Sequence, residues 1–292
     1  MPSPALQHAD LYLRRLGFAR PPAPTLDTLH LLQLRHTAAF AFETLNTFLR
    51  RPVPIELPSL ERKLLLEGRG GYCYELNGLY LALLRRLGFD AAPLTGRVVM
   101  GGPEDARPAR THQMVRVRVA GRDWLSDVGF GGMVPTAPLA LDDAAAQPTP
   151  HEPFRLERRA DGSLVLRAWV GAAWKAMYVF DLDLPAPVDL EMGNWYVSTH
   201  PDSPFLGRLV AARTGPFCRH TLRGGSYALH RLGQPSLRRE LRSPQAVIAV
   251  LQEVFGLRLP ADPALRAAIA RQLDEAADVP PASEPKVAET PV

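Results

Sequence analysis

The segment Arg69–Asn77, which reads RGGYCYELN, puts a cysteine where it can act as a nucleophile. The two glycines before Cys73 let the backbone turn tightly. Apolar residues then recur at three- and four-residue spacing up to Gly88, which predicts a helix whose first turn contains Cys73. The dipole at a helix N-terminus favours thiolate over thiol, and Arg69 can add positive potential. We therefore expect Cys73 to be a reactive thiol and not an inert, packed cysteine.

A nucleophilic cysteine needs a base, and that base needs a group to orient it. His112 stands at the start of an alternating run over residues 114–119, which is typical of a strand. Asp127 follows between apolar neighbours, where its alternative role is that of a turn or cap residue. The two share strand parity, so a regular hairpin puts both on one face. If residues 120–123 form the turn, Asp127 lies opposite Arg116, about 13 Å from His112 along the strand at roughly 3.3 Å per residue. Contact between His112 and Asp127 then requires a bulge or a different pairing.

A glycine cluster comes directly after Asp127, in the sequence Gly129-Phe130-Gly131-Gly132. Glycines after a strand let a ligand approach the backbone closely. The cluster matches neither the P-loop nor the dinucleotide-binding fingerprint, and a tight turn is its alternative explanation.

The apolar periodicity divides the chain into a helical part and a strand-rich part. Helical spacing extends from residue 6 to about 88, and alternation replaces it after residue 90. Strands are predicted at 98–99, 114–119, 124–128, 154–157, 164–166 and 174–178, with surface loops at 101–108 and 142–153. An antiparallel sheet or barrel fits residues 90–200. Short strands follow from 205, and then helices over 244–255 and 263–277.

Composition limits the classes of protein to which the chain can belong. Hydrophobic residues make up 46% of its 292 residues, which indicates a globular protein. The net charge is +4 and the pI is near 9.3, without a long basic run, which argues against nucleic acid and suits an anionic small ligand. Two cysteines, no signal-peptide pattern and no long apolar run predict a cytoplasmic protein that does not bind a membrane. No His or Cys spacing indicates a metal site. We expect Cys218 to have a buried structural role.

Five short motifs occur along the chain in this order: Arg69–Glu75, Thr111–His112, Asp127–Gly131, Asn194–Tyr196 and Ser203–Phe205. Together they resemble the motifs of the arylamine N-acetyltransferases, over nearly the whole chain before its C-terminal tail. The resemblance implies an α+β fold with an N-terminal helical bundle, a central antiparallel β-barrel and a C-terminal α/β lid, around a catalytic core like that of cysteine proteases. The corresponding domains are 1–89 for the bundle, 90–204 for the barrel, 205–277 for the lid and 278–292 for a disordered tail.

The same resemblance implies an activity and a set of site residues. The activity is acetyl transfer from acetyl-coenzyme A to arylamines or arylhydrazines, by a ping-pong mechanism through an acetyl-cysteine and without a metal. The implied catalytic triad is Cys73, His112 and Asp127. Further contacts are implied for Thr111, Gly131, Gly132 and Phe205 with coenzyme A, and for Phe42, Phe130 and Phe205 with the aromatic substrate.

Other functions remain open at the level of the sequence. The segment Ala41–Leu45 departs from the family, which usually has Pro before the Phe and Asn after the Glu. A Cys-His-Asp arrangement also serves amide synthases of secondary metabolism, cysteine hydrolases and transglutaminase-like enzymes. The chain shows no papain-type cysteine signature, secretion signal or calcium loop, which argues against the last two. A non-catalytic ligand-binding protein with the same fold is a further alternative.

Overall fold

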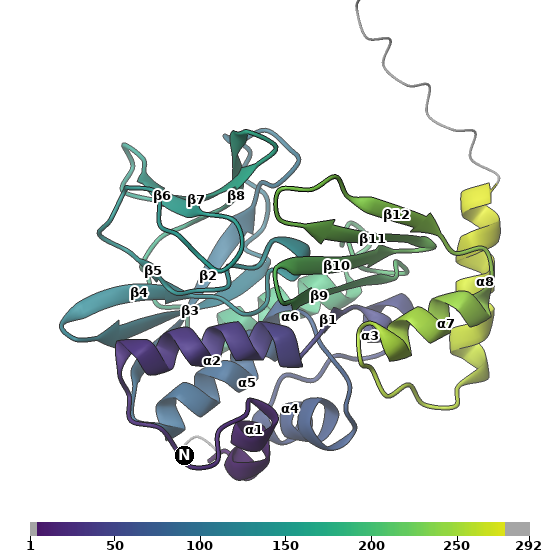
Figure 1. The fold of residues 1–292 in the computed structure, drawn as a ribbon, viewed down its shortest axis with the longest axis horizontal. Helices are drawn as coiled ribbons and strands as arrows, with labels where there is room; N and C mark the ends of the chain where they lie inside the picture. The colour runs from purple at the N-terminus through teal and green to yellow at the C-terminus, as the bar shows by residue number, and fades with distance from the viewer. Residues whose placement is uncertain (1–4, 278–292) are drawn as a thin grey trace, which may run out of the picture.

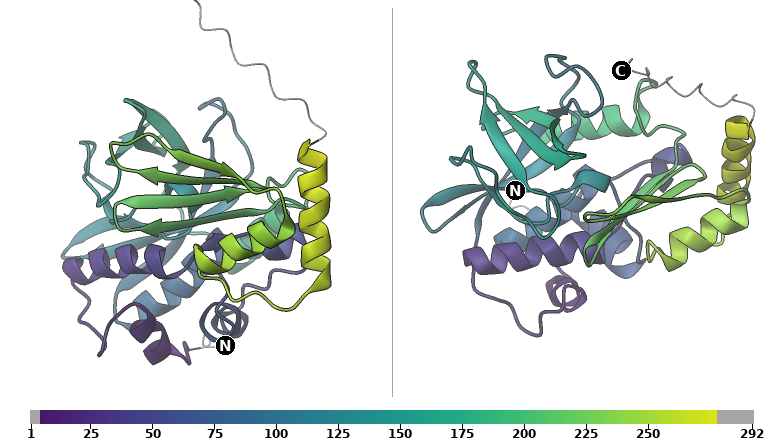
Figure 2. Two further views of the ribbon diagram at one scale, coloured as in Figure 1. Left: turned by 45° about the vertical axis from the view of Figure 1, so that its right-hand side comes forward. Right: turned by 45° about the horizontal axis from the view of Figure 1, so that its top comes forward.

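A computed structural model describes residues 5–277 of the chain. Helices from the N-terminal part lie along one side of two antiparallel sheets, and the last two helices pack at the far end of the second sheet (Figure 1). The seven-stranded sheet and the five-stranded sheet lie next to each other in Figure 1 and in the right-hand view of Figure 2.

The N-terminal helices are α1 (Ala9–Arg15), α2 (Leu26–Ala39), α3 (Leu45–Phe48), α4 (Leu57–Leu60) and α5 (Cys73–Arg86). Thr25 caps α2 by accepting a hydrogen bond from the N–H of Thr28 at 3.2 Å. A π-helical turn, Glu61–Leu66, continues α4. The helix predicted to begin at Cys73 is confirmed, and Gly88 follows it with a φ of +89°, a value that favours glycine.

The seven-stranded sheet is curled into a nearly closed barrel in the order β5-β4-β3-β2-β8-β7-β6. Its strands are β2 (Asp90–Val98), β3 (His112–Val119), β4 (Arg122–Ser126), β5 (Leu139–Ala140), β6 (Phe154–Arg158), β7 (Leu164–Val170) and β8 (Ala173–Phe180). Gln147 helps to join the two edge strands. Its side chain exchanges two hydrogen bonds with the backbone of Ala140 on β5, and its backbone bridges to Phe154 on β6.

The five-stranded sheet has the order β1-β9-β10-β11-β12. Its strands are β1 (Phe42–Glu43), β9 (Val210–Gly215), β10 (Cys218–Arg223), β11 (Ser226–Arg231) and β12 (Leu237–Glu240). The helix α6 (Pro187–Thr199) links the barrel to this sheet, and α7 (Pro244–Glu253) and α8 (Pro263–Ala277) follow it.

The three large apolar cores within residues 5–277 hold these layers together. One lies between the N-terminal helices and β3, one inside the barrel, and one between the five-stranded sheet and α7 and α8. The barrel core includes Leu94, Phe154 and Tyr178, each fully buried. Full burial of such a side chain stabilises the fold by about 1.5–3 kcal/mol. The catalytic candidates therefore stand on elements that are anchored on both sides.

Two elements differ from the sequence prediction. Phe42 and Glu43 lie in a segment predicted to be helical but form β1, because β9 offers them a pairing partner far away in the sequence. Residues 187–199 were included in the strand-rich part but form α6, whose first turn contains Pro187. The fold class and the strands predicted at 154–157, 164–166 and 174–178 are confirmed. The four-part domain division stays a prediction, and its tail, residues 278–292, lies outside the described residues.

No helix within residues 5–277 is both long enough and apolar enough to cross a bilayer.

Candidate active site

Cys73 is the first residue of α5 and is 3% exposed. Glu75 holds this helix end by accepting a hydrogen bond from the N–H of Tyr72 at 3.0 Å, and its carboxylate pairs with Lys63 at 2.5 Å. The glycines before Cys73 serve close packing and not a left-handed turn. A Cβ on Gly71 would lie 2.7 Å from the Cβ of Glu75, and neither Gly70 nor Gly71 has a positive φ.

The β3–β4 hairpin brings His112 and Asp127 together through a tighter turn than the sequence suggested. Ala120 and Gly121 alone form the turn, with φ of +54° and +75°. Val115 consequently pairs with Ser126, and Asp127 comes two residues nearer to His112 than a turn over 120–123 would place it. Nε2 of His112 lies 2.7 Å from Oδ2 of Asp127. The turn predicted over residues 120–123, and with it the pairing of Asp127 with Arg116, is wrong. Of the two alternatives, a bulge or a different pairing, the structure shows the different pairing.

Asp127 is fully buried, and its carboxylate accepts four hydrogen bonds. Oδ1 accepts from the amide of Asn77 at 3.0 Å and from the N–H of Gly129 at 2.9 Å, and Oδ2 accepts from the hydroxyl of Tyr178 at 3.0 Å and from His112. Burial acts to raise the pKa of Asp127, but the charge and hydrogen bond of His112, together with the bonds from Asn77 and Gly129, lower it overall. Asp127 is therefore an ionised carboxylate in the interior.

His112 carries the opposite shift. Burial lowers its pKa, but the carboxylate of Asp127 and the nearby sulfur of Cys73 outweigh burial and raise the pKa to about 10. The imidazole is consequently protonated at neutral pH. Sγ of Cys73 lies 3.5 Å from the carbonyl oxygen of Thr111, the residue before His112. A buried cysteine beside an imidazolium that a carboxylate orients is the arrangement of a nucleophilic thiol site.

The glycine cluster packs directly against this group. A Cβ on Gly129 would lie 2.8 Å from Cα of Cys73 and 2.6 Å from the amide nitrogen of Asn77, so no larger residue fits without movement. Gly131 has a φ of +65°, and a Cβ on Gly132 would lie 3.0 Å from the methyl group of Thr221 on β10. Gly129 and Gly132 therefore allow close packing against their neighbours, and Gly131 allows a left-handed turn of the backbone.

One cavity of about 490 Å³ lies between α5, β3 and the glycine cluster that follows β4. Cys73 and His112 line it, as do all the residues named for coenzyme A and substrate: Phe42, Thr111, Phe130, Gly131, Gly132 and Phe205. The rings of Phe42 and Phe205 meet edge to face with centroids 5.7 Å apart. Two arginines on the five-stranded sheet, Arg223 and Arg238, also line the cavity, and no carboxylate is among its lining residues in the described part of the chain.

Sequence reasoning missed several residues of this site. Asn77 stands in the cysteine motif, one helical turn after Cys73, and that spacing was the signal that could have found it. Tyr178 comes from β8, and no local pattern pointed to it. Arg69, expected near the thiol, instead donates two hydrogen bonds to Glu43, at 2.8 and 3.1 Å.

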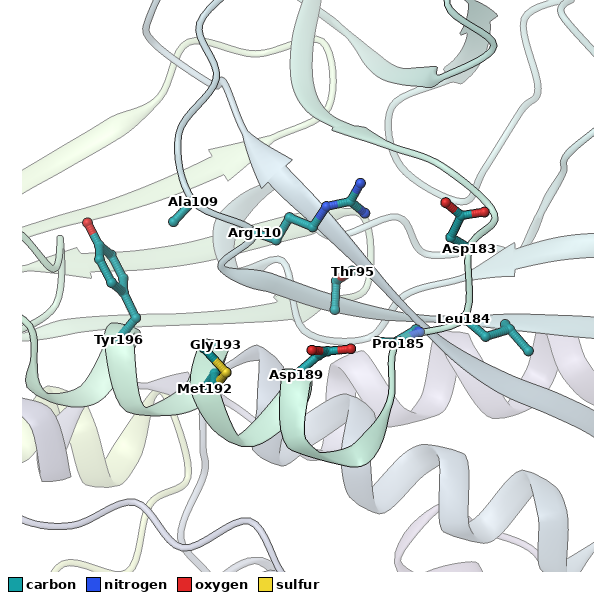
Figure 3. A pocket seen from close by; sticks show the side chains of 10 residues that line it. All are labelled: Thr95, Ala109, Arg110, Asp183, Leu184, Pro185, Asp189, Met192, Gly193 and Tyr196. Carbon is teal, nitrogen blue, oxygen red and sulfur yellow. The ribbon is translucent and has the colours of Figure 1, made fainter.

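A second pocket of about 500 Å³ lies between α6 and the segment that leads into β3 (Figure 3). Arg110, Asp183, Asp189 and Tyr196 are among its lining residues, and the guanidinium of Arg110 pairs with Asp181. None of the residues named for chemistry lines this pocket. Within residues 5–277 there is no group of three His, Cys, Asp or Glu side chains that could hold a metal ion.

Cys218 differs from its expected buried role. It is half-buried at the start of β10, with Sγ 3.6 Å from Nε2 of His220. Nδ1 of His220 lies 2.8 Å from the hydroxyl oxygen of Tyr227. The molecule therefore contains two cysteine–histidine pairs, and only the first lines the cavity.

Comparison with known proteins gives a consistent set of relatives. The family model described as N-acetyltransferase matches residues 25–264. The arylamine N-acetyltransferase of Mycolicibacterium smegmatis is 41% identical over 252 residues, which cover 85% of this chain and 91% of the relative. That of Escherichia coli strain K12 is 37% identical over 262 residues, with 87% and 89% covered. The solved structure of the Mycobacterium marinum arylamine N-acetyltransferase in complex with CoA superimposes with a TM-score of 0.85 at 41% identity, over 89% of this chain and 97% of that one.

Proposed function

Because this chain belongs to the arylamine N-acetyltransferase family, we propose that Cys73, His112 and Asp127 are the groups with which it transfers acetyl from acetyl-coenzyme A to an aromatic amine or hydrazine. The observation that carries this proposal is the 2.7 Å contact between His112 and Asp127 next to a buried cysteine at a helix N-terminus. The three side chains have the geometry of a nucleophile, a base and an orienting carboxylate.

The first half-reaction transfers acetyl to the enzyme. The Cys73 thiolate attacks the thioester carbonyl, the carbon–sulfur bond of the donor breaks, and coenzyme A leaves with the proton that it takes from the His112 imidazolium. The backbone N–H groups of Cys73 and Tyr74, the first two residues of α5, have no intrahelical acceptor, and we assign to them the stabilisation of the developing oxyanion. Such a donor typically contributes roughly 3 kcal/mol to the stability of the transition state.

The second half-reaction returns the enzyme to its starting state. The amine nitrogen attacks the acetyl carbon, its proton passes to the neutral His112, and Cys73 leaves as a thiolate. Asp127 keeps the imidazole in one orientation and stabilises its charge each time it is protonated. The carboxylate does not take up the proton, since four hydrogen bonds hold it in its ionised form.

We assign the walls of the cavity to the two substrates. Phe42, Phe130 and Phe205 exclude water from the acetyl-cysteine and pack against the aromatic acceptor, which suits a weakly basic amine. Thr111, Gly131, Gly132 and Phe205 contact coenzyme A, because the glycines leave room for a ligand at the backbone. Both cysteines are free in the structure, which suits a reducing compartment such as the cytoplasm.

The charges of the cavity support an anionic donor. Arg223 and Arg238 line it on the side of the five-stranded sheet, away from the N-terminal helices that carry Cys73. Guanidinium groups bind phosphate oxygens in a bidentate manner. We therefore add Arg223 and Arg238 to the residues proposed to bind the phosphates of coenzyme A. A protease-like hydrolase would not need this pair of cations.

Intact mass spectrometry tests the proposal directly. The protein is mixed with acetyl-coenzyme A without an acceptor, and we expect a gain of one acetyl group that is absent in Cys73→Ala and present in Cys218→Ala. Addition of an arylamine should remove that acetyl group. A Cys73 that iodoacetamide alkylates quickly but that takes up no acetyl would point instead to an amide synthase or a hydrolase. A Cys73 that neither reagent modifies would contradict an enzymatic role.

A further inference from the structure

The loop between β5 and β6 reaches across to the five-stranded sheet. The sequence suggested only a surface loop over residues 142–153, yet His151 within it is buried and Glu152 is held by an ion pair. Nε2 of His151 lies 3.1 Å from the carbonyl oxygens of both Gly215 and Cys218, at the end of the β9–β10 hairpin. The loop between β5 and β6 of the barrel therefore makes hydrogen bonds and an ion pair with the tip of the β9–β10 hairpin of the other sheet.

The ion pair is the stronger part of this contact. Arg219, on β10, is 3% exposed and donates to the Glu152 carboxylate from Nε at 2.8 and 3.1 Å and from Nη2 at 2.6 Å. Thr149 accepts a hydrogen bond from the N–H of His151 and donates one to the carbonyl oxygen of Glu152, which fixes the loop from within. A two-nitrogen, charge-assisted contact of this kind restricts direction as well as distance.

Arg219 stands on the same strand as two residues of the cavity. Thr221 and Arg223 follow it at two and four residues, so all three side chains are on one face of β10. The methyl group of Thr221 packs closely beside Gly132, where a Cβ would lie only 3.0 Å from it. Arg223 is one of the two arginines that line the cavity. Movement of Arg219 would therefore shift both residues relative to the barrel.

The sheet has other attachments as well. Next to the hairpin tip, two residues of β9 are held by α2: Thr214 donates to the hydroxyl of Thr37 at 3.0 Å, and Nε of Arg213 donates to the carbonyl oxygen of Ala38 at 2.7 Å. β1 pairs with β9 through Phe42 and Ala212 and fixes the sheet to the N-terminal part of the chain. The face opposite the barrel packs on α7 and α8. On the barrel side, the hairpin tip is held by His151 and by the pair of Glu152 with Arg219.

We infer that Glu152 and Arg219 form a clamp that sets the distance between the β9–β10 hairpin and the barrel, and that they thereby position the donor-binding wall of the cavity. The inference rests on the proposed function, since it assigns that wall to coenzyme A. Neither residue lines the cavity, so both are positioning residues and not catalytic ones.

Steady-state kinetics with Glu152→Gln and Arg219→Met tests the clamp. We expect KM for acetyl-coenzyme A to rise about fivefold or more, the lower end of coupling between two sites, while kcat at saturating donor and the alkylation rate of Cys73 stay within about twofold. Arg219→Lys keeps the charge but loses the two-nitrogen contact, and should give an intermediate KM.

Arg167→Met is the matched control. Arg167 donates to Glu104 and Glu157 at 2.7–2.8 Å within the barrel and makes no ion pair with the five-stranded sheet in residues 5–277. It should lower stability without changing KM. An unchanged KM in Glu152→Gln, or an equal rise in Arg167→Met, would overturn the clamp.

Amide hydrogen exchange along β10 gives a readout that does not depend on the reaction. Exchange should be faster in Glu152→Gln than in the wild type and unchanged in Arg167→Met. Unchanged exchange in Glu152→Gln would also overturn the clamp. If the wild type takes up no acetyl group, the proposed function fails while this measurement still decides whether the clamp holds the hairpin.

Discussion

The molecule contains two cysteine–histidine pairs, Cys73 with His112 and Cys218 with His220. They differ in the backbone position of the cysteine and in the group that contacts the histidine. Cys73 begins a helix and faces an imidazole that a buried carboxylate orients. Cys218 begins a strand and lies 3.6 Å from an imidazole that a tyrosine hydroxyl contacts. A thiol next to an imidazole is thus not enough to predict a nucleophile, because the third group and the backbone position decide the charge on the imidazole.

The two imidazoles carry opposite shifts. The pKa of His112 is raised to about 10, since Asp127 and Cys73 outweigh burial. The pKa of His220 is lowered, first by burial and then by the positive charges of Arg213 and Arg231. At neutral pH Cys73 therefore faces a cation and Cys218 faces a neutral ring, and we expect chemistry at the first cysteine alone.

The largest expected effect comes from removal of the orienting charge. Asp127→Asn should lower kcat/KM by roughly a thousandfold or more, because the buried imidazole loses its tautomer control and its counter-charge. Tyr227→Phe removes the corresponding partner of His220 and should leave kcat/KM unchanged. The measurement is arylamine acetylation, with circular dichroism to verify folding. Equal losses in both variants would contradict the distinction between the two pairs.

Alkylation by iodoacetamide sharpens the same comparison without the reaction. Because the pKa of His112 is raised, its imidazolium persists from neutral pH until the pH rises through about 10, and labelling of Cys73 should stay nearly constant between pH 6 and 9. Labelling of Cys218 should be slower by about a hundredfold at pH 7, given the range over which neighbouring cations activate thiols. Peptide mass spectrometry resolves the two sites, and a faster Cys218 would refute the contrast.

Each cysteine also has a glycine packed against it, and the two glycines should respond differently to substitution. A Cβ on Gly129 would lie 2.8 Å from the backbone Cα of Cys73, whereas the atoms nearest to a Cβ on Gly215 belong to side chains, the sulfur of Cys218 at 2.9 Å and Nε2 of His220 at 3.7 Å. A backbone atom cannot rotate away, and misplacement by about 1 Å can cost up to a hundredfold in rate. Gly129→Ala should therefore lower kcat by about ten- to a hundredfold, and Gly215→Ala by less than about twofold. Similar rates for the two variants would show that the close packing at Cys73 has no catalytic importance.

The sequence was most informative where the signal was local. The helix that begins at Cys73 and the strand that begins at His112 were both predictable from spacing within about fifteen residues. The contact between His112 and Asp127 was not, because it depends on whether two or four residues form the hairpin turn. A left-handed conformation at Ala120, which alanine rarely adopts, decided that question.

Residues supplied by distant strands escaped prediction for a related reason. Tyr178 reaches Asp127 only because β8 pairs with β2 in the barrel. Glu43 lies beside Arg69 because Phe42 bridges to Gly71 and the N–H of Glu43 donates to the carbonyl oxygen of Gly71 at 3.0 Å, a contact between segments nearly thirty residues apart. Side chains of this kind carry no local signature, and their partners are fixed by sheet order, which one sequence does not reveal.

Substitution of Tyr178 should give the smallest of the activity losses predicted for the Cys73–His112 pair. Its hydroxyl donates one of the four hydrogen bonds that keep Asp127 ionised, so Tyr178→Phe leaves three in place and retains the ring against His112. Loss of one hydrogen bond to a charged group amounts to about 1.5–3 kcal/mol, and the remaining donors should absorb part of it. We expect kcat/KM to fall by about tenfold.

The pH dependence of Cys73 labelling in Tyr178→Phe shows whether the hydroxyl orients the Asp127 carboxylate or stabilises its charge. If the Tyr178 hydroxyl mainly holds the carboxylate in its ionised form, its loss raises the pKa of Asp127 and weakens the charge that keeps His112 protonated. The pH range over which Cys73 labelling stays constant should then end at a lower pH than in the wild type. A tenfold loss of kcat/KM with an unchanged range would mean that Tyr178 only orients the carboxylate, and the contrast between the two histidines would then depend on Asp127 alone.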